Sequence, residues 1–105
     1  MALAETIFVD KTEVVSIATT YSPYRYSNVQ VRTADVVEKD GVEIAWSFHR
    51  KVLHAGTVGI GTTLVPTDIS GEEPEVQAVC NAVWTDNAKE AYRAYLVGIR
   101  SEGLG

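Results

Sequence analysis

The sequence has few residues of the kinds that usually carry crosslinks or metal chemistry. It contains one cysteine, two histidines and three prolines among 105 residues. An internal disulfide is therefore excluded, and the paired Cys and His spacings of zinc sites are missing. His49 and His54 fall in a predicted strand with opposite side-chain directions, so they do not share a metal ion. We expect no metal site.

Long apolar runs and an excess of basic residues are also lacking. No run approaches the ~20 apolar residues that cross a bilayer, and residues 1–10 lack the basic and apolar regions of a secretory signal. Nine Lys and Arg stand against fourteen Asp and Glu, for a formal net charge of −5. This balance argues against nucleic acid or an anionic membrane as the main partner.

Motifs for catalysis or cofactor binding are not found. Gly56, Gly59 and Gly61 follow a predicted strand, but their spacing matches neither a dinucleotide fingerprint nor a P-loop. Cys80 falls within a helical apolar pattern, which indicates a buried thiol that acts as a small hydrophobe. We therefore expect a protein without enzymatic activity and without a cofactor.

The composition that remains is that of an ordinary globular domain. Hydrophobic residues make up 46% of the chain and charged residues 22%, close to globular averages. A chain of this length forms one domain with a small core. We expect a single domain over residues 1–105, with a sheet region at 5–55, a connector at 56–69, and helices at 70–84 and 86–100.

A hairpin over residues 28–54 is the clearest local signal. Asp40-Gly41 separates two alternating runs, and tight primed turns need positive φ. A two-residue loop would set Glu38 opposite Glu43, a like-charge pair, so a four-residue loop is favoured. A strand at 12–19, preceded by a short extended segment at 7–9, comes before the hairpin.

Alternation along the hairpin predicts one buried and one open face. The predicted buried face consists of Val29, Val31, Thr33, Asp35, Val37, Ile44, Trp46, Phe48, Arg50 and Val52, with Asp35 and Arg50 at its rim. The open face, available to solvent or a partner, collects Gln30, Arg32, Ala34, Glu38, Glu43, Ser47, His49 and Lys51.

Two helices are predicted after the connector. Ser70 and Glu73 have capping-box spacing, so the first helix is expected to begin at residue 70, with Pro74 in its first turn. Thr85 is a fresh N-cap for the second helix, whose last turn Gly98 weakens.

The elements together predict an α+β fold, an antiparallel meander of three or four strands with two C-terminal helices packed on one face. The predicted core consists of Val29, Val31, Val37, Ile44, Trp46, Phe48, Val52, Val76, Val79, Val83, Trp84, Tyr92, Tyr95 and Leu96.

Two segments are longer than this scaffold requires and are candidate interfaces: a tyrosine-rich loop at 20–28 and the connector at 56–69. Aromatic and Arg side chains are enriched at interface centres, although these rings could instead fold back over the sheet edge. The connector has one possible short strand at 62–65. The candidate interface residues of the two loops are Tyr21, Tyr24, Arg25, Tyr26, Val58, Ile60 and Leu64.

Residues 29–44, 47–53, 70–73 and 76–85 together resemble a group of small proteins encoded by tailed bacteriophages. The similarity lies in the overall pattern, contains no catalytic motif and carries over no site residues. It implies a phage origin and a structural part of the particle. The loop at 21–26 and the connector at 56–69 are longer here than in that pattern.

The function that the resemblance implies is a non-enzymatic structural or assembly protein of the tail, baseplate, neck or capsid surface. Such a protein is made in the host cytoplasm, resides in the virion, and contacts other phage structural proteins or further copies of itself. The alternative is a small phage-encoded adaptor or inhibitor that binds a host protein through the tyrosine-rich loop.

Overall fold

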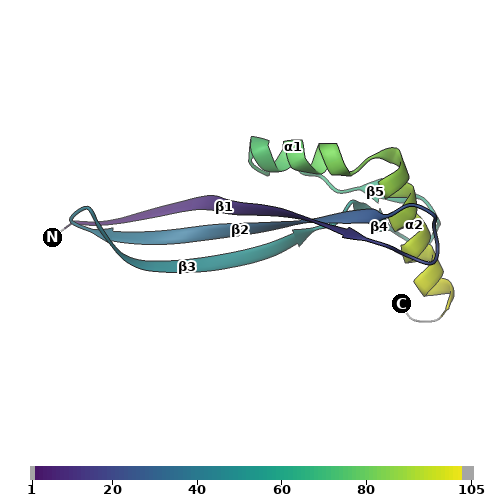
Figure 1. The fold of residues 1–105 in the computed structure, drawn as a ribbon, viewed down its shortest axis with the longest axis horizontal. Coiled ribbons are helices and arrows are strands. Elements are labelled where there is room, and N and C mark those ends of the chain that lie inside the picture. The colour runs from purple at the N-terminus through teal and green to yellow at the C-terminus, as the bar shows by residue number, and fades with distance from the viewer. Residues whose placement is uncertain (1, 103–105) are drawn as a thin grey trace.

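A computed structural model describes residues 2–102 of the chain and shows a sheet with two C-terminal helices (Figure 1). The order of elements is β1 (Leu3–Ile17), β2 (Tyr26–Lys39), β3 (Val42–Leu53), β4 (Gly56–Val58), β5 (Leu64–Pro66), α1 (Pro74–Val83) and α2 (Asp86–Ser101). The first three strands form an antiparallel sheet in the order β1-β2-β3, and β4 pairs with β5 separately. The predicted α+β meander with two C-terminal helices is confirmed.

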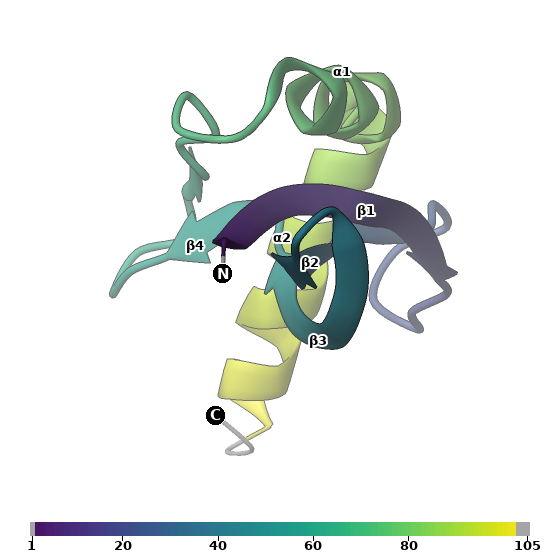
Figure 2. The ribbon, with the colours of Figure 1, turned by 90° about the vertical axis from the view of Figure 1, so that its left-hand side faces the viewer.

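The molecule is elongated, with extents of 59 × 27 × 22 Å. In Figure 1 the three long strands extend well beyond the helices, which gather at one end of the sheet, and Figure 2 views this projection end-on. We call the projecting part, made of residues 3–9, 33–39 and 42–49, the arm. None of the described helices is both long enough and apolar enough to span a membrane.

The turn at the tip of the arm has two residues. Asp40 has φ 54° and Gly41 has φ 81°, and Lys39 pairs directly with Val42. The preference for a four-residue loop was wrong, because a primed turn matches the twist of the strands. The half-buried Glu38 and the exposed Glu43 do face one another, a repulsion that solvent weakens.

A bulge next to this turn changes which side chains share a face. The pairing shifts between Val37 and Glu38 of β2, so that Val37 faces Ala45 while Glu38 faces Glu43. An extra residue on β3 reverses the alternation beyond it. Trp46 and Phe48 therefore share the face of Val36 and Ala34, and the predicted common face with Val29 to Val37 is wrong.

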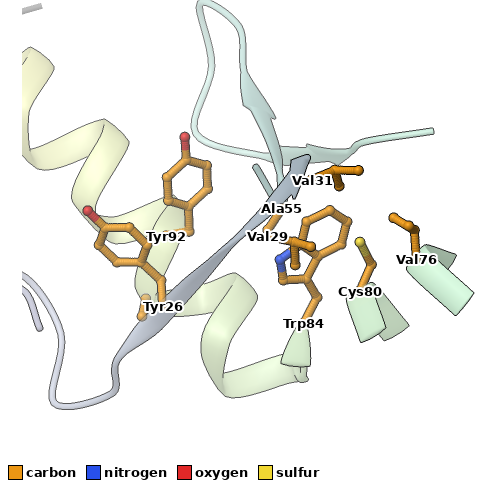
Figure 3. Packing of buried hydrophobic residues seen from close by; sticks show 9 residues of the cluster. Tyr26, Val29, Val31, Ala55, Val76, Cys80, Trp84 and Tyr92 are labelled. Carbon is orange, nitrogen blue, oxygen red and sulfur yellow. The ribbon is translucent and has the colours of Figure 1, made fainter. Parts of the chain in front are cut away.

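The core lies at the helix end of the sheet (Figure 3). Trp84 packs against β2, where its indole Nε1 donates a hydrogen bond to the Ser27 carbonyl at 2.9 Å. The buried cluster consists of Tyr26, Val29, Val31, Ala55, Val76, Cys80, Trp84, Ala91 and Tyr92. Val79, Val83, Tyr95 and Leu96 are partly buried against it, and Val37 is half-buried on the arm.

Four residues predicted to be in the core are exposed on β3. They are Ile44, Trp46, Phe48 and Val52. The prediction was wrong because the bulge turns Trp46 and Phe48 to the face of the sheet opposite the one on which Val29 and Val31 pack against the core. Val52 pairs with Gln30 and lies on the same outward face, and Ile44 is the extra residue at the bulge. Apolar alternation identified the strand correctly but could not say that nothing packs over its distal part.

The helix starts were predicted with mixed success. The first helix begins at Pro74, with Glu73 as an N-cap whose side chain makes no capping hydrogen bond, so the predicted start at Ser70 is wrong. Ser70 instead belongs to a turn in which its amide donates to Asp68 Oδ1 at 2.9 Å. Thr85 caps the second helix as predicted, accepting from the Ala88 amide at 3.2 Å.

The N-terminal strand and the connector also differ from expectation. The first strand is a single element over Leu3–Ile17, with a bulge between Val9 and Lys11. The sequence had predicted a short segment at 7–9 separate from a strand at 12–19. The connector holds the small β4–β5 hairpin, where one strand had been expected.

Candidate interaction surface

Three aromatic side chains line one face of the arm. Phe8 and Phe48 flank Ala34 in the pairing of the strands, and Trp46 lies opposite Val36. The Phe8 and Trp46 ring centroids are 6.1 Å apart in an edge-to-face arrangement, and those of Trp46 and Phe48 are 6.0 Å apart. We call Phe8, Trp46 and Phe48 the aromatic cluster and this side of the arm the aromatic face.

The cluster is half open to solvent. Ala34 and Val36 are buried beneath the rings, whereas Phe8 is 37%, Trp46 46% and Phe48 47% exposed. Contiguous apolar surface of this kind on a soluble protein usually marks a contact site for another molecule. The aromatic face is therefore the strongest candidate interaction surface on the described part of the chain.

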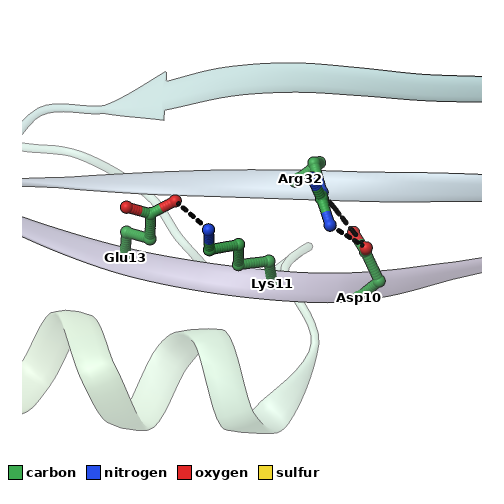
Figure 4. Close-up of polar contacts among 4 residues, drawn as sticks. All are labelled: Asp10, Lys11, Glu13 and Arg32. Atoms are coloured by element: carbon green, nitrogen blue, oxygen red, sulfur yellow. Dashed lines mark hydrogen bonds and ion pairs between the residues drawn. The ribbon is translucent and has the colours of Figure 1, made fainter.

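An ion pair between Asp10 and Arg32, shown in Figure 4, lies at the end of the aromatic cluster nearest the helices. Arg32 Nε and Nη2 bond the Asp10 carboxylate at 3.0 and 2.6 Å, and the Arg32 Cζ lies 4.4 Å from the Phe48 ring centroid. The Arg32 guanidinium lowers the pKa of Asp10. Asp10 stands at the β1 bulge, so the bulge provides the position from which its carboxylate reaches Arg32.

The opposite face of the arm is apolar at its edge and acidic at its centre. Leu3 and Ile7 are exposed on β1, while Glu5 and Asp35 are diagonal neighbours across β1 and β2. The adjoining Asp35 carboxyl raises the pKa of Glu5, because the two groups favour a shared proton. Within residues 2–102, Asp35 Oδ1 is buried and has no hydrogen-bond partner.

Two of the tyrosines singled out in the first loop fold back onto the helices. Tyr26 is only 6% exposed, with its ring centroid 5.1 Å from that of Tyr92 and 5.2 Å from that of Tyr95. Tyr26 is therefore a core residue and not part of a free surface, which corrects its place among the candidates. Tyr21 is half-buried against Tyr95, at a centroid distance of 6.4 Å, and against Gly98.

The other two candidates of this loop lie at the surface. Tyr24 is 46% exposed. Arg25 is also exposed, but its Nε donates to Ser16 Oγ at 2.9 Å and its Nη2 to the Ser16 carbonyl at 3.0 Å. Arg25 therefore ties the loop to the end of β1.

The connector is held against the second helix by arginines. Arg100 donates to the carbonyls of Gly59 and Gly61 at 2.6 and 2.7 Å, and Arg93 donates to the carbonyl of Thr62 at 3.3 Å. These bonds give the connector a fixed path over the surface.

Of the three connector candidates, only one projects into solvent. Val58 and Leu64 pair across β4 and β5 and are half-buried, with Leu64 packed on the core. Ile60 is fully exposed between these two strands. The structure thus separates Ile60 from Val58 and Leu64.

The two histidines, His49 and His54, have different surroundings in the described part of the chain. His54 is stacked on Tyr92, with centroids 5.8 Å apart, and its Nδ1 lies 3.0 Å from Asn28 Oδ1, while His49 is exposed on the arm. No group of three metal-binding side chains occurs in the part of the chain that the structure describes. Burial raises the pKa of the Cys80 thiol, as expected for a core residue.

The aromatic face was missed by sequence reasoning, although its residues were noticed. Trp46 and Phe48 were assigned to the core because they alternate with polar residues. No local signal separates them from core residues, because the bulge that turns them away from the face of Val29 and Val31 is a property of the pairing between β2 and β3.

Comparison of this chain with protein-family models, with curated proteins and with solved structures finds no match in any of the three.

Proposed function

We propose that this protein is a non-enzymatic structural or assembly component of a tailed phage particle that acts through protein–protein contacts of its arm. The observation that carries the proposal is the arm itself, which projects from the core with apolar side chains exposed on both faces. It fits a part of the tail, baseplate, neck or capsid surface, made in the host cytoplasm and held in the virion.

The physical argument is that such an arm is incomplete in isolation. Among residues 2–102, no strand pairs with the outer edge of β1, which has 15 residues, or of β3, which has 12. Such an edge leaves backbone amides and carbonyls ready to bond another strand. Most of the large exposed apolar side chains lie on these two strands. A partner that covers the arm would bury both the apolar surface and the backbone edge.

The resemblance to small phage proteins supports the location in a particle. It spans β2, β3 and the first helix, and so includes the strands that form most of the arm. Net charge of −5 is compatible with contacts to protein surfaces.

Mass spectrometry of washed particles tests the proposal. We expect the protein at a fixed ratio to the other virion proteins, and its absence from washed particles would overturn the proposal. In particles assembled with the variant Trp46→Glu we expect the protein to be reduced at least about tenfold, because a charge replaces a central apolar contact. Tyr24→Glu changes an equally exposed aromatic residue outside the arm and is the matched control.

A host-protein adaptor is the second candidate, and the exposed Tyr24 is the observation in its favour. It receives less support, because Tyr21 and Tyr26 of the same loop are used in packing. An adaptor predicts that the chain retains one host protein from lysate and that Tyr24→Ala with Arg25→Ala abolishes retention.

A further inference from the structure

We propose that the β3 edge pairs antiparallel with the β3 edge of a second copy, which joins two three-stranded sheets into one and merges their aromatic clusters. The inference rests on the proposed role of the arm as a contact surface, and it names a second copy of this chain as the partner. It commits to a two-fold arrangement, in which both copies use the same strand.

The β3 strand is the less protected of the two sheet edges. From Ala45 to Leu53 its register with β2 is unbroken, and every residue from Val42 to Val52 is exposed. The first strand is interrupted by the bulge at Asp10, and bulges are one way in which proteins block edge pairing. An edge lysine would also block pairing, but Lys51 is drawn away by Glu72 at 2.7 Å.

A two-fold axis also allows a register of β3 with β3 in which no like charges face one another. An axis normal to the sheet keeps each face on its own side, so residues that pair must come from the same face. With Phe48 on the axis, Phe48 faces its own copy and Trp46 faces Arg50 of the second chain. Ser47 then faces His49, and Ala45 faces Lys51. This register places no two like charges opposite one another, whereas an axis at His49 would bring both imidazoles together.

In this register Trp46 and Arg50 complement one another. In the described part of the chain Arg50 takes part in no ion pair or side-chain hydrogen bond, and Trp46 presents a half-exposed ring. The same face already holds an arginine on an aromatic ring, with Arg32 4.4 Å from the Phe48 centroid. Pairing two β3 strands would repeat this arrangement twice across the interface.

The apolar side-chain area that β3 can bury against a second copy is small. Trp46 is 46% and Phe48 47% exposed, so the two rings keep roughly half of the ~150–250 Å² that an aromatic residue can bury. With Val52 and the neighbouring aliphatic stems, each copy would bury about 300 Å² of apolar side chain, below the ~800 Å² per partner of a standard interface. We therefore expect a dissociation constant in the micromolar range.

Sedimentation equilibrium of the pure chain, from micromolar to near-millimolar concentration, tests the pairing. The wild-type mass should rise from 11.4 kDa to twice that value. Phe48→Glu should raise the dissociation constant at least about tenfold, while Tyr24→Glu, an aromatic residue of similar exposure outside the arm, should leave it unchanged. Far-ultraviolet circular dichroism establishes that both variants are folded.

Cysteine crosslinking tests the register. A chain with Ser47→Cys mixed with a chain with His49→Cys should form a disulfide-linked heterodimer under mild oxidation, because the two positions face one another. Ser47→Cys alone should not crosslink, and the native Cys80 is fully buried and stays silent.

Three outcomes would overturn the inference. They are a wild-type monomer at every concentration, a dimer that Phe48→Glu does not weaken, and open-ended polymers that indicate head-to-tail pairing with β1. None of them bears on whether the protein is present in washed particles, so failure here is distinguishable from failure of the proposed function.

Discussion

Gly98 and Tyr21 show how a single residue can have a meaning that only its neighbour explains. In sequence, Gly98 is a weak point in the last turn of a helix. In the structure, the Tyr21 ring lies against it, and a Cβ at this position would overlap the ring. The glycine is therefore the place where the first loop docks on the second helix.

We expect Gly98→Ala to destabilise the protein, although the same change in an open helix stabilises by about 0.5–1 kcal/mol. The added methyl displaces the Tyr21 ring from α2. Urea unfolding of a double-mutant cycle checks this, because in a Tyr21→Ala background the Gly98→Ala change should become neutral or stabilising. An equal loss in both backgrounds would contradict the docking role.

The Glu5 and Asp35 pair gives a prediction with a defined pH dependence. The raised pKa of Glu5 means that the folded chain binds this proton more tightly than the unfolded chain. The contribution of the pair is therefore full below the ordinary Glu pKa of ~4.3 and is lost as pH rises through the higher folded value.

Asp35→Asn removes one charge and supplies an amide donor to Glu5. We expect a higher melting temperature than wild type at pH 7, with the difference shrinking toward zero as pH falls below about 4. Thermal unfolding across this range measures it. A difference that does not vary with pH would show that the two carboxyls do not interact.

At the scale of elements, the β2–β3 hairpin combines a local and a non-local decision. The Asp40-Gly41 turn follows from residue conformation, because φ is positive at both positions. The bulge that follows it places Trp46 and Phe48 over Ala34 and Val36. This pairing buries both small side chains under aromatic rings, a gain that depends on β1 contributing Phe8 from the other side.

Gly41→Ala should destabilise by about 1 kcal/mol, because an alanine in the left-handed region is strained. No atom lies within 4 Å of the added Cβ, so the loss reports backbone conformation alone. Urea unfolding measures it, with Gly59→Ala as the control, since Gly59 is equally open and its φ is not positive. Equal effects at the two glycines would contradict the requirement of the turn.

At the scale of the whole molecule, stability and contact surface lie at different ends. The buried cluster joins β2 to both helices, while the arm extends along the longest dimension of 59 Å. This separation lets surface residues of the arm change with little effect on folding, and core residues change with no direct effect on contact.

Val29→Ala and Val42→Ala test this separation with the same chemical change. Val29 is fully buried, so its loss should cost about 2 kcal/mol from lost transfer energy and the cavity left behind. Val42 is exposed near the tip of the arm, and its replacement should be nearly neutral. Urea unfolding of both compares them, and similar losses would mean that the arm contributes to the cooperative core.

The sequence by itself determined the elements whose signals are local. The position of the turn at Asp40-Gly41, though not its length, depends on residues close in the chain, as do the Thr85 cap, the apolar stripe with buried Cys80 and the α+β order. Backbone conformation and helical periodicity are properties of short segments, so a single sequence contains them.

Only the tertiary structure decided what covers each face. A bulge at one residue reversed the side-chain alternation of β3 and turned Trp46 and Phe48 away from the core face of Val29 and Val31. Tyr26, by contrast, became a core residue. An apolar residue follows the same pattern in a strand whether a helix or solvent lies above it. The difference is made by packing between distant segments, which is why the candidate surface moved from the tyrosine loop to the arm.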